Sequence, residues 1–379
     1  MKNVDVIIVG GGPSGSTLGY LLQKNGISCC IIDKCTFPRE KLCGGLLTQK
    51  TISLIDNIYG EVAFPYETIT SRVNIFLGKD TITHVDTNST FYLVERYDFD
   101  LYLINKYREL SGLLYENSTI TSMDLHHHVA IINNKEEISF KIVVGADGAN
   151  SQIRKIIESG FRPNLACLEC NYPAKNLSEE VNIYFGFVLS GYGWCFPKKN
   201  HYTIGIGGKR KKNKRIRDNY VSFLKTFDIE YSDIKIKGAM LPCGIYVKKP
   251  CKDQIMLVGD AAGFVDSVTG EGIYFALLSA QYGFHAINDY LQYGLSLSES
   301  YLKRVRYIQH IIKDGNRFYR LFFNDYIRSF LLKRVKGRKT VIKYVCENII
   351  SNYHTSYLAL PFRYLITKGK KKWIPTVKI

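Results

Sequence analysis

The sequence predicts an α/β protein with a doubly wound parallel-sheet domain, an inserted antiparallel β-rich domain and a helical C-terminal region. Three observations lead to this prediction. A strand–glycine loop–helix–strand unit opens the chain, segments of alternating hydrophobicity follow it, and glycine-rich turns return near residues 147 and 260. Turns that belong to one parallel sheet but lie far apart in sequence imply that the domain is assembled from separated segments.

The opening unit spans residues 4–33. Residues 4–9 and 27–32 are short apolar runs typical of buried strands, and residues 13–24 between them have helical character that Gly26 ends. The turn after the first strand fits G-x-G-x-x-G. Its residues are Gly10, Gly11, Gly12, Pro13, Ser14 and Gly15.

This glycine loop is typical of a dinucleotide site. Gly10 permits the tight turn, Gly12 lets the backbone approach a pyrophosphate, and Gly15 lets the helix pack on the strand. The helix N-terminus would supply amide donors to the phosphates. Asp33, at the end of the second strand, is expected to accept hydrogen bonds from ribose hydroxyls.

Later segments extend the pattern. We predict a hairpin over 70–95, a helix over 97–112, strands over 118–145, antiparallel strands over 180–208, a strand at 255–258 and helices near 271–290 and beyond 298. Segments 1–70, 125–160 and 240–300 are assigned to the nucleotide-binding domain. Segments 71–124 and 161–239 are assigned to the β-rich substrate domain, and 301–379 to a basic helical C-terminal region.

The charge balance favours an anionic partner. Lysine and arginine number 51 against 34 acidic residues, giving a net charge of +17. No nucleic-acid recognition motif is present, so nucleic acid is not predicted. The basic, aromatic segment 317–379 instead suggests an anionic membrane surface, with a solvated basic helix face as the alternative. A lysine-rich compositional bias explains the charge equally well.

The ten cysteines form no disulfide framework. No secretion signal precedes the glycine loop, and no apolar run reaches the roughly 18 residues of a membrane-spanning helix. We therefore expect a cytoplasmic protein with free thiols, peripheral at the inner face of the membrane. Cys167 and Cys170 form one C-x-x-C without a second pair, so no metal site is predicted.

Two later turns place an aspartate directly after a glycine or alanine at a strand end, as helix capping would also do. They contain Asp147 and Asp260. Together with G-x-G-x-x-G, Asp33 and Arg96, they resemble the two-domain FAD-dependent oxidoreductases typified by aromatic hydroxylases. The resemblance implies a Rossmann-like FAD-binding domain. It places Asp260 at the ribityl–pyrophosphate part of FAD and Arg96 in contact with the cofactor.

The full set of residues expected to bind FAD combines these motifs with their neighbours. Gly270 and Gly272 precede a helix whose N-terminal dipole would stabilise the charge of reduced flavin; a plain helix start is the alternative. The expected residues are Gly10, Gly12, Pro13, Ser14, Gly15, Asp33, Lys34, Arg39, Cys43, Gly44, Arg96, Asp147, Gly259, Asp260, Gly270 and Gly272. A second G-x-G-x-x-G is absent, so the electron donor is NAD(P)H that docks transiently or a reduced redox protein.

Two motifs narrow the resemblance. They are FPREKLCGG at 37–45, and Y-x-W-x-F-P at 192–197 with Gly205 eight residues after Pro197. Together with GDAAGFVDSVTGEGI they resemble the geranylgeranyl reductase family, including CbrA-type bacterial relatives. That resemblance implies reduction of carbon–carbon double bonds in a polyprenyl chain. Leu189 and Ser267 stand where the family has prolines, which leaves the exact substrate open.

The substrate site is expected at the second motif. Tyr192, Trp194 and Phe196 alternate, so they share one side of a strand and would line an apolar tunnel; packing in the core is the alternative. The expected substrate-binding residues are Tyr192, Trp194, Phe196, Pro197 and Gly205.

The resemblance also implies a mechanism. Reduced FAD would deliver hydride from N5 to one alkene carbon, and the proton would come from solvent or a side chain. Cys43 is the candidate catalytic residue, as proton donor, with a place in the pocket wall as the alternative. A flavin monooxygenase or halogenase stays an alternative, although its one candidate lysine, Lys79, falls in a hairpin turn. A low-turnover protein that binds FAD and lipid at a membrane is a third possibility.

Overall fold

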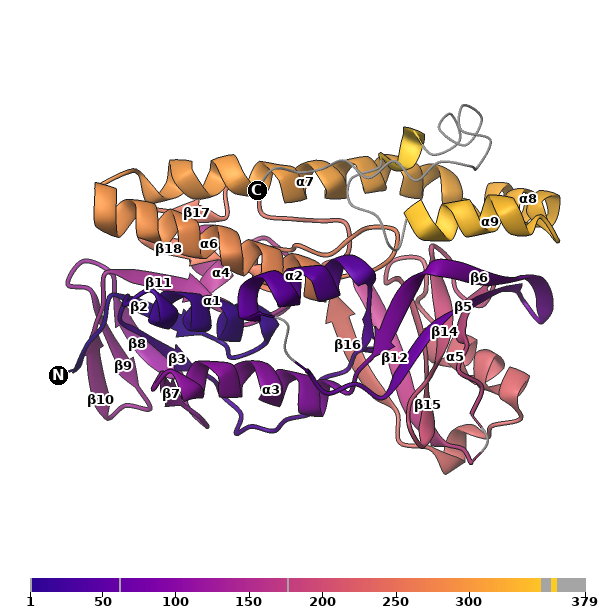
Figure 1. The fold of residues 1–379 in the computed structure, drawn as a ribbon, viewed down its shortest axis with the longest axis horizontal. Coiled ribbons are helices and arrows are strands. Elements are labelled where there is room, and N and C mark those ends of the chain that lie inside the picture. The colour runs from indigo at the N-terminus through magenta and orange to yellow at the C-terminus, as the bar shows by residue number, and fades with distance from the viewer. Residues whose placement is uncertain (1, 61–62, 176, 349–355, 360–379) are drawn as a thin grey trace.

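The structure is a computed structural model that describes residues 2–60, 63–175, 177–348 and 356–359. These residues form three β-sheets. In Figure 1 a parallel sheet with its helices occupies the left half, and a larger sheet occupies the right half. A long C-terminal helix, α7 (Leu297–Phe322), runs along both. The molecule therefore has the predicted α/β class, with the β-rich part beside the parallel domain.

The parallel sheet is the predicted nucleotide-binding unit. Its central strands are apolar and buried, as in a parallel sheet that is covered on both faces. Only its edge strand β17 runs antiparallel. The strand order is β17 (Cys251–Lys252), β18 (Ile255–Leu257), β11 (Ile142–Gly145), β2 (Val6–Val9), β3 (Cys29–Ile32) and β7 (Leu113–Tyr115).

The first helix, α1 (Pro13–Lys24), has the predicted bounds. Pro13 occupies its first turn, where the missing N–H costs nothing, and Gly26 beyond its end has a φ of +72°. α1 packs against α3 (Arg96–Glu109) and α6 (Ile273–Tyr293). This packing fixes the glycine loop at the carboxyl end of β2.

The predicted assignment of 71–124 to the β-rich domain is corrected by the pairing of the strands. β7 pairs with β3 in the parallel sheet, and the Tyr107 hydroxyl of α3 donates to the Cys29 carbonyl of β3 at 3.0 Å. A three-residue strand shows no alternation, so its sequence did not indicate which sheet it joins. A small third sheet flanks this domain and consists of β1 (Lys2–Asn3), β10 (Glu136–Ser139), β9 (Val129–Ile132) and β8 (Ile120–Asp124).

The large sheet contains the predicted hairpin, whose turn places Gly78 at a φ of +60° and leaves Lys79 exposed. Neighbouring strands are antiparallel except for the pair β13–β5. The order is β16 (Lys237–Leu241), β12 (Leu165–Pro173), β15 (His201–Lys209), β14 (Gly191–Pro197), β13 (Val181–Phe185), β5 (Thr68–Leu77), β6 (Asp80–Leu93) and β4 (Leu46–Leu47).

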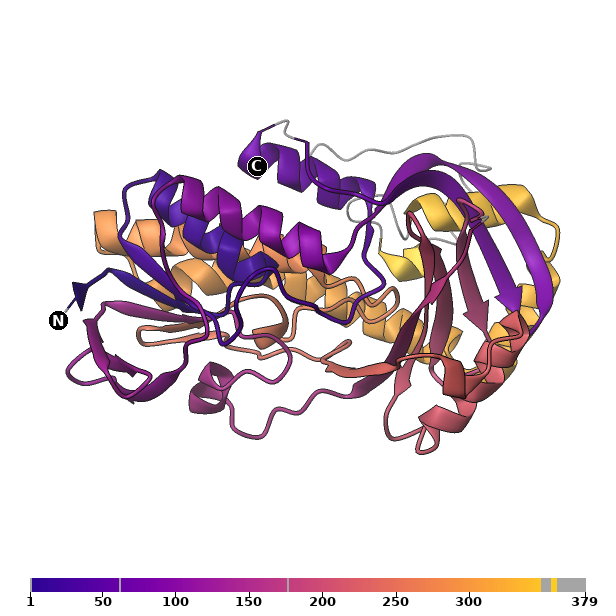
Figure 2. The ribbon, with the colours of Figure 1, turned by 90° about the horizontal axis from the view of Figure 1, so that it is seen from below.

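Helices cover this sheet and join it to the parallel domain. α5 (Ile216–Leu224) follows the lysine- and arginine-rich segment 209–215, and α2 (Gln49–Tyr59) lies between the two halves. At the C-terminal end, α8 (Asp325–Val335) and α9 (Lys339–Cys346) lie over the large sheet, where α9 contacts β6 (Figure 2). The lysine-rich segment 368–373 lies outside the described residues. Among those described, no helix is long and apolar enough to cross a membrane.

Candidate active site

A single cavity of about 1500 Å³ connects the two halves of the molecule. The glycine turns of the parallel sheet line one end, the aromatic face of β14 lines the middle, and α7 to α9 line the far end. Typical small-molecule sites enclose roughly 300–1,000 Å³. The cavity therefore has room for a cofactor and a second ligand.

The first glycine loop has no room for side chains. A Cβ on Gly15 would lie 1.8 Å from the Gly10 carbonyl oxygen, and one on Gly10, whose φ is +103°, would lie 2.5 Å from the Ala146 oxygen. The Ser16 hydroxyl donates to the Gly11 oxygen at 2.8 Å and holds the turn. Gly10, Gly12, Pro13 and Ser14 line the cavity, as a phosphate-binding loop requires.

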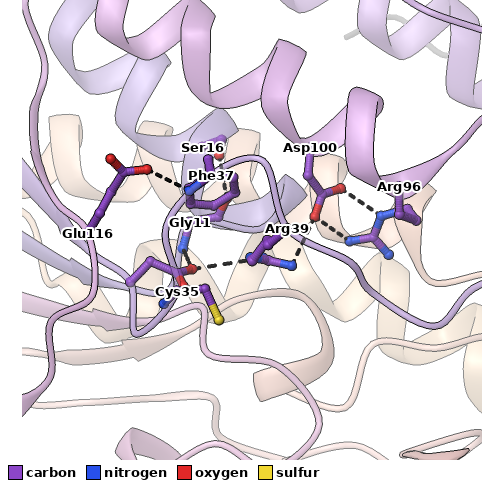
Figure 3. Close-up of polar contacts among 9 residues, drawn as sticks. Gly11, Ser16, Cys35, Phe37, Arg39, Arg96, Asp100 and Glu116 are labelled. Atoms are coloured by element: carbon purple, nitrogen blue, oxygen red, sulfur yellow. Dashed lines mark hydrogen bonds and ion pairs between the residues drawn. The ribbon is translucent and has the colours of Figure 1, made fainter. Parts of the chain in front are cut away.

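Asp33 organises the neighbouring loop. Its Oδ2 accepts the Gly11 amide at 2.7 Å, and its Oδ1 accepts the Cys35 amide at 2.9 Å. Arg39 lies 3.8 Å from Asp33 and 3.4 Å from Asp100 (Figure 3). Each Asp33 oxygen keeps a further acceptor position for a ribose hydroxyl. Lys34 is exposed at the rim of the same cavity.

Arg96 lies at the start of α3 and forms a buried bidentate pair. Its Nε and Nη2 donate to the two oxygens of Asp100 at 2.6 and 2.7 Å (Figure 3). Burial opposes the charge, but Asp100 holds the pKa of Arg96 above its usual value. Arg96 also lies close enough to Cys43 for the two side chains to interact, and it lines the cavity.

The turns at Asp147 and Asp260 are joined by one arginine. Arg154 donates to the Ala149 and Ala261 carbonyl oxygens at 2.6 and 3.0 Å. Asp147 accepts the Gln152 amide through Oδ2 at 2.6 Å. Its Oδ1 is buried, and no described residue donates a hydrogen bond to it. Both aspartates line the cavity, so Asp147 offers it an unused acceptor.

The third turn leads into α6. Glu271 accepts the Thr48 hydroxyl at 2.7 Å and pairs with Lys50, which ties this turn to α2. Gly270 and Gly272 line the cavity, and the first residue of α6 lines it too. The N-terminal end of this long helix therefore borders the cavity, where an anionic ligand group would be favoured. Gly259 has a φ of +56° and lies against Ser14 rather than in the lining.

The Cys43-Gly44-Gly45 loop lines the cavity and packs against β14 of the large sheet. A Cβ on Gly44 would lie 2.8 Å from the Phe196 ring, and one on Gly45, whose φ is +70°, would lie 2.0 Å from the Val94 oxygen. Protein packing thus already requires both glycines. Cys43 is half-buried at this point of the lining.

The aromatic residues of β14 do share one face. Tyr192, Trp194 and Phe196 all line the cavity, and the Tyr192 hydroxyl donates to the Thr269 carbonyl. Gly205 lies under the indole: a Cβ there would be 2.3 Å from Trp194 Cζ2. Gly205 and Pro197 lie outside the cavity lining, so they shape the wall from behind.

Two buried charged residues that contact the Cys43 loop, Glu169 and Lys198, are not among those predicted from the sequence. The Glu169 carboxylate accepts the Cys43 amide and the Trp194 indole N–H, each at 3.2 Å. Lys198 donates to the carbonyl oxygens of Gly44 and Val94 at 2.9 and 2.7 Å. Burial raises the pKa of Glu169 to about 7, and burial lowers the pKa of Lys198.

The alternation of residues along the strands could have identified Glu169 and Lys198. Glu169 is two residues after Cys167 on β12, and Lys198 is two residues after Phe196, so both belong to the inner face. The same alternation turns Cys167 and Cys170 to opposite faces of the sheet, where they join different apolar clusters. That geometry does not suit a shared metal ion.

These features fit FAD. The glycine loop admits a pyrophosphate, Gly148 leaves open space beside the unused acceptor of Asp147, and the N-terminus of α6 faces the same cavity. The described residues would hold the adenosine end near Asp33 and the reactive end near Cys43.

Comparison with known proteins agrees with this fit. The FAD binding domain family matches residues 3–169. Digeranylgeranylglycerophospholipid reductase 3 of Methanosphaera stadtmanae is 31% identical over 306 residues, which cover 74% of this chain and 76% of the relative. The chain belongs to the geranylgeranyl reductase family of FAD-dependent oxidoreductases. An uncharacterized protein of Methanosarcina barkeri, 30% identical, covers 88% of the chain and 87% of its own length.

Solved structures show how widely this family shares its fold. A geranylgeranyl bacteriochlorophyll reductase-like protein of Thermoplasma acidophilum has a TM-score of 0.71 at 19% identity, covering 97% of this chain and 99% of its own. The halogenase PltM has a TM-score of 0.70 at 15% identity, covering 84% and 76%. The fold thus serves both reductive and oxidative enzymes, and the reaction depends on the site.

Proposed function

We propose that this FAD-dependent oxidoreductase reduces carbon–carbon double bonds of an isoprenoid or polyprenyl lipid. The observation that carries the proposal is the continuous cavity, which joins the FAD-binding loops to an aromatic and aliphatic wall. Relatives named digeranylgeranylglycerophospholipid reductase and geranylgeranyl diphosphate reductase support the same substrate class. An apolar chain has few groups to recognise, so a long apolar wall is the binding surface it needs.

Each part of the site has a role in this proposal. Bound FAD supplies the hydride chemistry. The N-terminus of α6 would stabilise negative charge that develops at its end of the cavity. Cys43 lies in the cavity lining beside Arg96, where its Sγ is placed to donate a proton. The rings of Tyr192, Trp194 and Phe196 exclude water from an apolar chain.

The proposal is tested by single turnover without oxygen. The purified flavoprotein is reduced with dithionite, mixed with a geranylgeranyl lipid, and the lipid is analysed by mass spectrometry. We expect mass gains of two hydrogens for each double bond reduced. Dithionite replaces the natural donor, for which NAD(P)H and a reduced redox protein stay the two candidates. Unchanged lipid mass with the flavin still reduced would contradict the proposal.

An oxidative reaction gives different products. A monooxygenase would add oxygen to the substrate only after air is admitted, and a halogenase would also need halide. Lys79 is exposed on a turn, and the amine of Lys198 is engaged by two carbonyl oxygens, so neither is presented to the cavity as a free amine. A protein that only binds FAD and lipid would give no new product in either experiment.

Cys43 is the residue proposed to supply the proton. A general acid contributes a rate factor of about 10²–10⁴. We therefore expect Cys43→Ala to lower single-turnover reduction about a hundredfold at unchanged FAD content. The matched control is Cys35→Ala, a second partly buried thiol of the same cavity wall. Equal turnover in Cys43→Ala and the native protein would remove the catalytic role and leave Cys43 as part of the wall.

A further inference from the structure

Exposed apolar side chains gather at the end of α7 and on α8. Tyr326 is 89% exposed, Phe330 64%, Leu321 50% and Leu331 38%. Tyr326 and Phe330 are one turn apart, so they lie on the same face of α8. We refer to these four residues as the α8 surface. A group of this size is more than the scattered apolar residues of an ordinary surface.

Cations follow the α8 surface along the chain. The exposed residues that follow it are Lys333, Arg334, Lys336, Arg338 and Lys339. Asp325, the one acid of α8, pairs with Arg328 at 2.7 Å. None of the five cations forms an ion pair with a carboxylate of the described residues. The local field is therefore positive and uncompensated within that part of the chain.

The cavity reaches the α8 surface. Leu321 and Leu331 are exposed and also line the cavity, and Leu332 and Val335 continue its wall inward. Figures 1 and 2 place α8 and α9 at the end of the molecule furthest from the N-terminus, over the large sheet. An apolar chain could thus pass from the α8 surface into the cavity along an apolar wall.

We propose that the α8 surface docks on an anionic lipid bilayer with the cavity mouth facing the membrane. Tyrosine and phenylalanine insert at the level of the lipid headgroups, and flanking lysine and arginine attract anionic lipids. A folded protein partner would need a complementary shape, whereas a bilayer accepts this mixture of apolar residues and cations. The inference rests on exposure and charge, and it stands apart from the reduction chemistry.

The test is co-sedimentation of the full FAD-loaded chain with vesicles. Vesicles of phosphatidylcholine and phosphatidylglycerol in equal parts are compared with vesicles of phosphatidylcholine alone. We expect binding to the anionic vesicles that weakens at high salt. Tyr326→Ser with Phe330→Ser should lower the partition coefficient about tenfold. Lys333→Ala with Arg334→Ala should lower it about fivefold for each cation lost.

The matched control lies at the opposite end of the molecule, where α6 leads into α7 (Figure 1). Tyr293 and Leu295 are 72% and 52% exposed there, and Tyr293→Ser with Leu295→Ser should bind like the native protein. The proposal is overturned if the native protein ignores anionic vesicles, or if it binds them equally well without Tyr326 and Phe330. A loss of binding in the Tyr293/Leu295 variant as large as in the Tyr326/Phe330 variant would overturn it too. Failure of lipid reduction does not bear on this result.

Discussion

Single glycines decide where the rings of the cavity wall can lie. Gly44 admits the Phe196 ring, and Gly205 admits the Trp194 indole, because a Cβ at either position would overlap an aromatic atom. The motif residues that look like ligand contacts in the sequence are therefore partly packing residues. The wall that they allow is what a substrate would meet.

Gly205→Ala tests this packing role. The added Cβ would lie 2.3 Å from Trp194 Cζ2, so the indole must move. We expect a loss of about 1–3 kcal/mol in the free energy of unfolding, measured by urea denaturation. The control is Gly238→Ala on β16, whose nearest contact would be an ordinary 3.4 Å. Equal stability of the two variants would contradict the packing role.

Glu169 should make stability depend on pH. Its pKa is about 7 in the folded protein against an ordinary value of 4.5, so the folded state binds the proton more tightly. Its contribution is complete below pH 4.5 and is lost as pH rises through about 7. The corresponding change in the free energy of unfolding is on the order of 3 kcal/mol.

Glu169→Gln should remove that dependence. We expect the decline in unfolding free energy between these pH values to become shallower than in the native protein, as measured by denaturation across the range. Glu137→Gln, an exposed position on β10, should keep the native slope. A native slope in Glu169→Gln would show that the carboxyl titrates normally in the folded state.

Among the elements, α3 connects the FAD-binding loops to the Cys43 loop. Arg96 and Asp100 occupy successive turns of the helix, and Arg39 reaches Asp100 from the segment before Cys43. One buried carboxylate thus serves two guanidinium groups. Helix α3 thus buries a charged pair, Arg96 and Asp100, on the side that faces the site.

Asp100→Asn should therefore lower the free energy of unfolding. It leaves Arg96 without its carboxylate and Arg39 with Asp33 alone, and removal of one partner from a buried pair costs about 3–5 kcal/mol. Urea denaturation measures this loss. Asp98→Asn, an exposed position on the same helix, should change the free energy of unfolding by less than about 0.5 kcal/mol. Similar values for the two variants would contradict the importance of the pair.

For the whole molecule, three regions far apart in sequence enclose one cavity. The parallel domain supplies the glycine turns, the large sheet supplies the aromatic wall, and α7 to α9 close the far end. Removal of the C-terminal helices would open this wall. Substrate length should therefore depend on residues more than 300 positions from the glycine loop.

Val345→Trp tests that dependence. Val345 lines the far end of the cavity from α9, and an indole there would shorten it. We expect reduction of a long prenyl lipid to fall about tenfold at unchanged FAD content, since a close-packed wall cannot admit the extra volume without displacement of the chain. Thr340→Trp, exposed on the same helix, is the control. Native turnover in Val345→Trp would mean that the lipid does not reach α9.

Much of the fold was predictable because its signals are local. The glycine spacing, the apolar runs at 4–9 and 27–32 and the helix between them lie within one βαβ unit. The hairpin around Gly78 and the shared face of Tyr192, Trp194 and Phe196 follow from turn chemistry and strand alternation in the same way.

The sequence by itself thus determined the α/β class, the FAD cofactor and the family. Tertiary structure alone decided that β7 joins the parallel sheet and that α7 to α9 complete the cavity. It also decided that Glu169 accepts a hydrogen bond from the Cys43 amide, 126 residues away in the sequence. The physical reason is the distance along the chain over which each interaction acts. Turn geometry and periodicity act between near neighbours, whereas strand partners, buried charge contacts and cavity walls depend on which distant surfaces pack together.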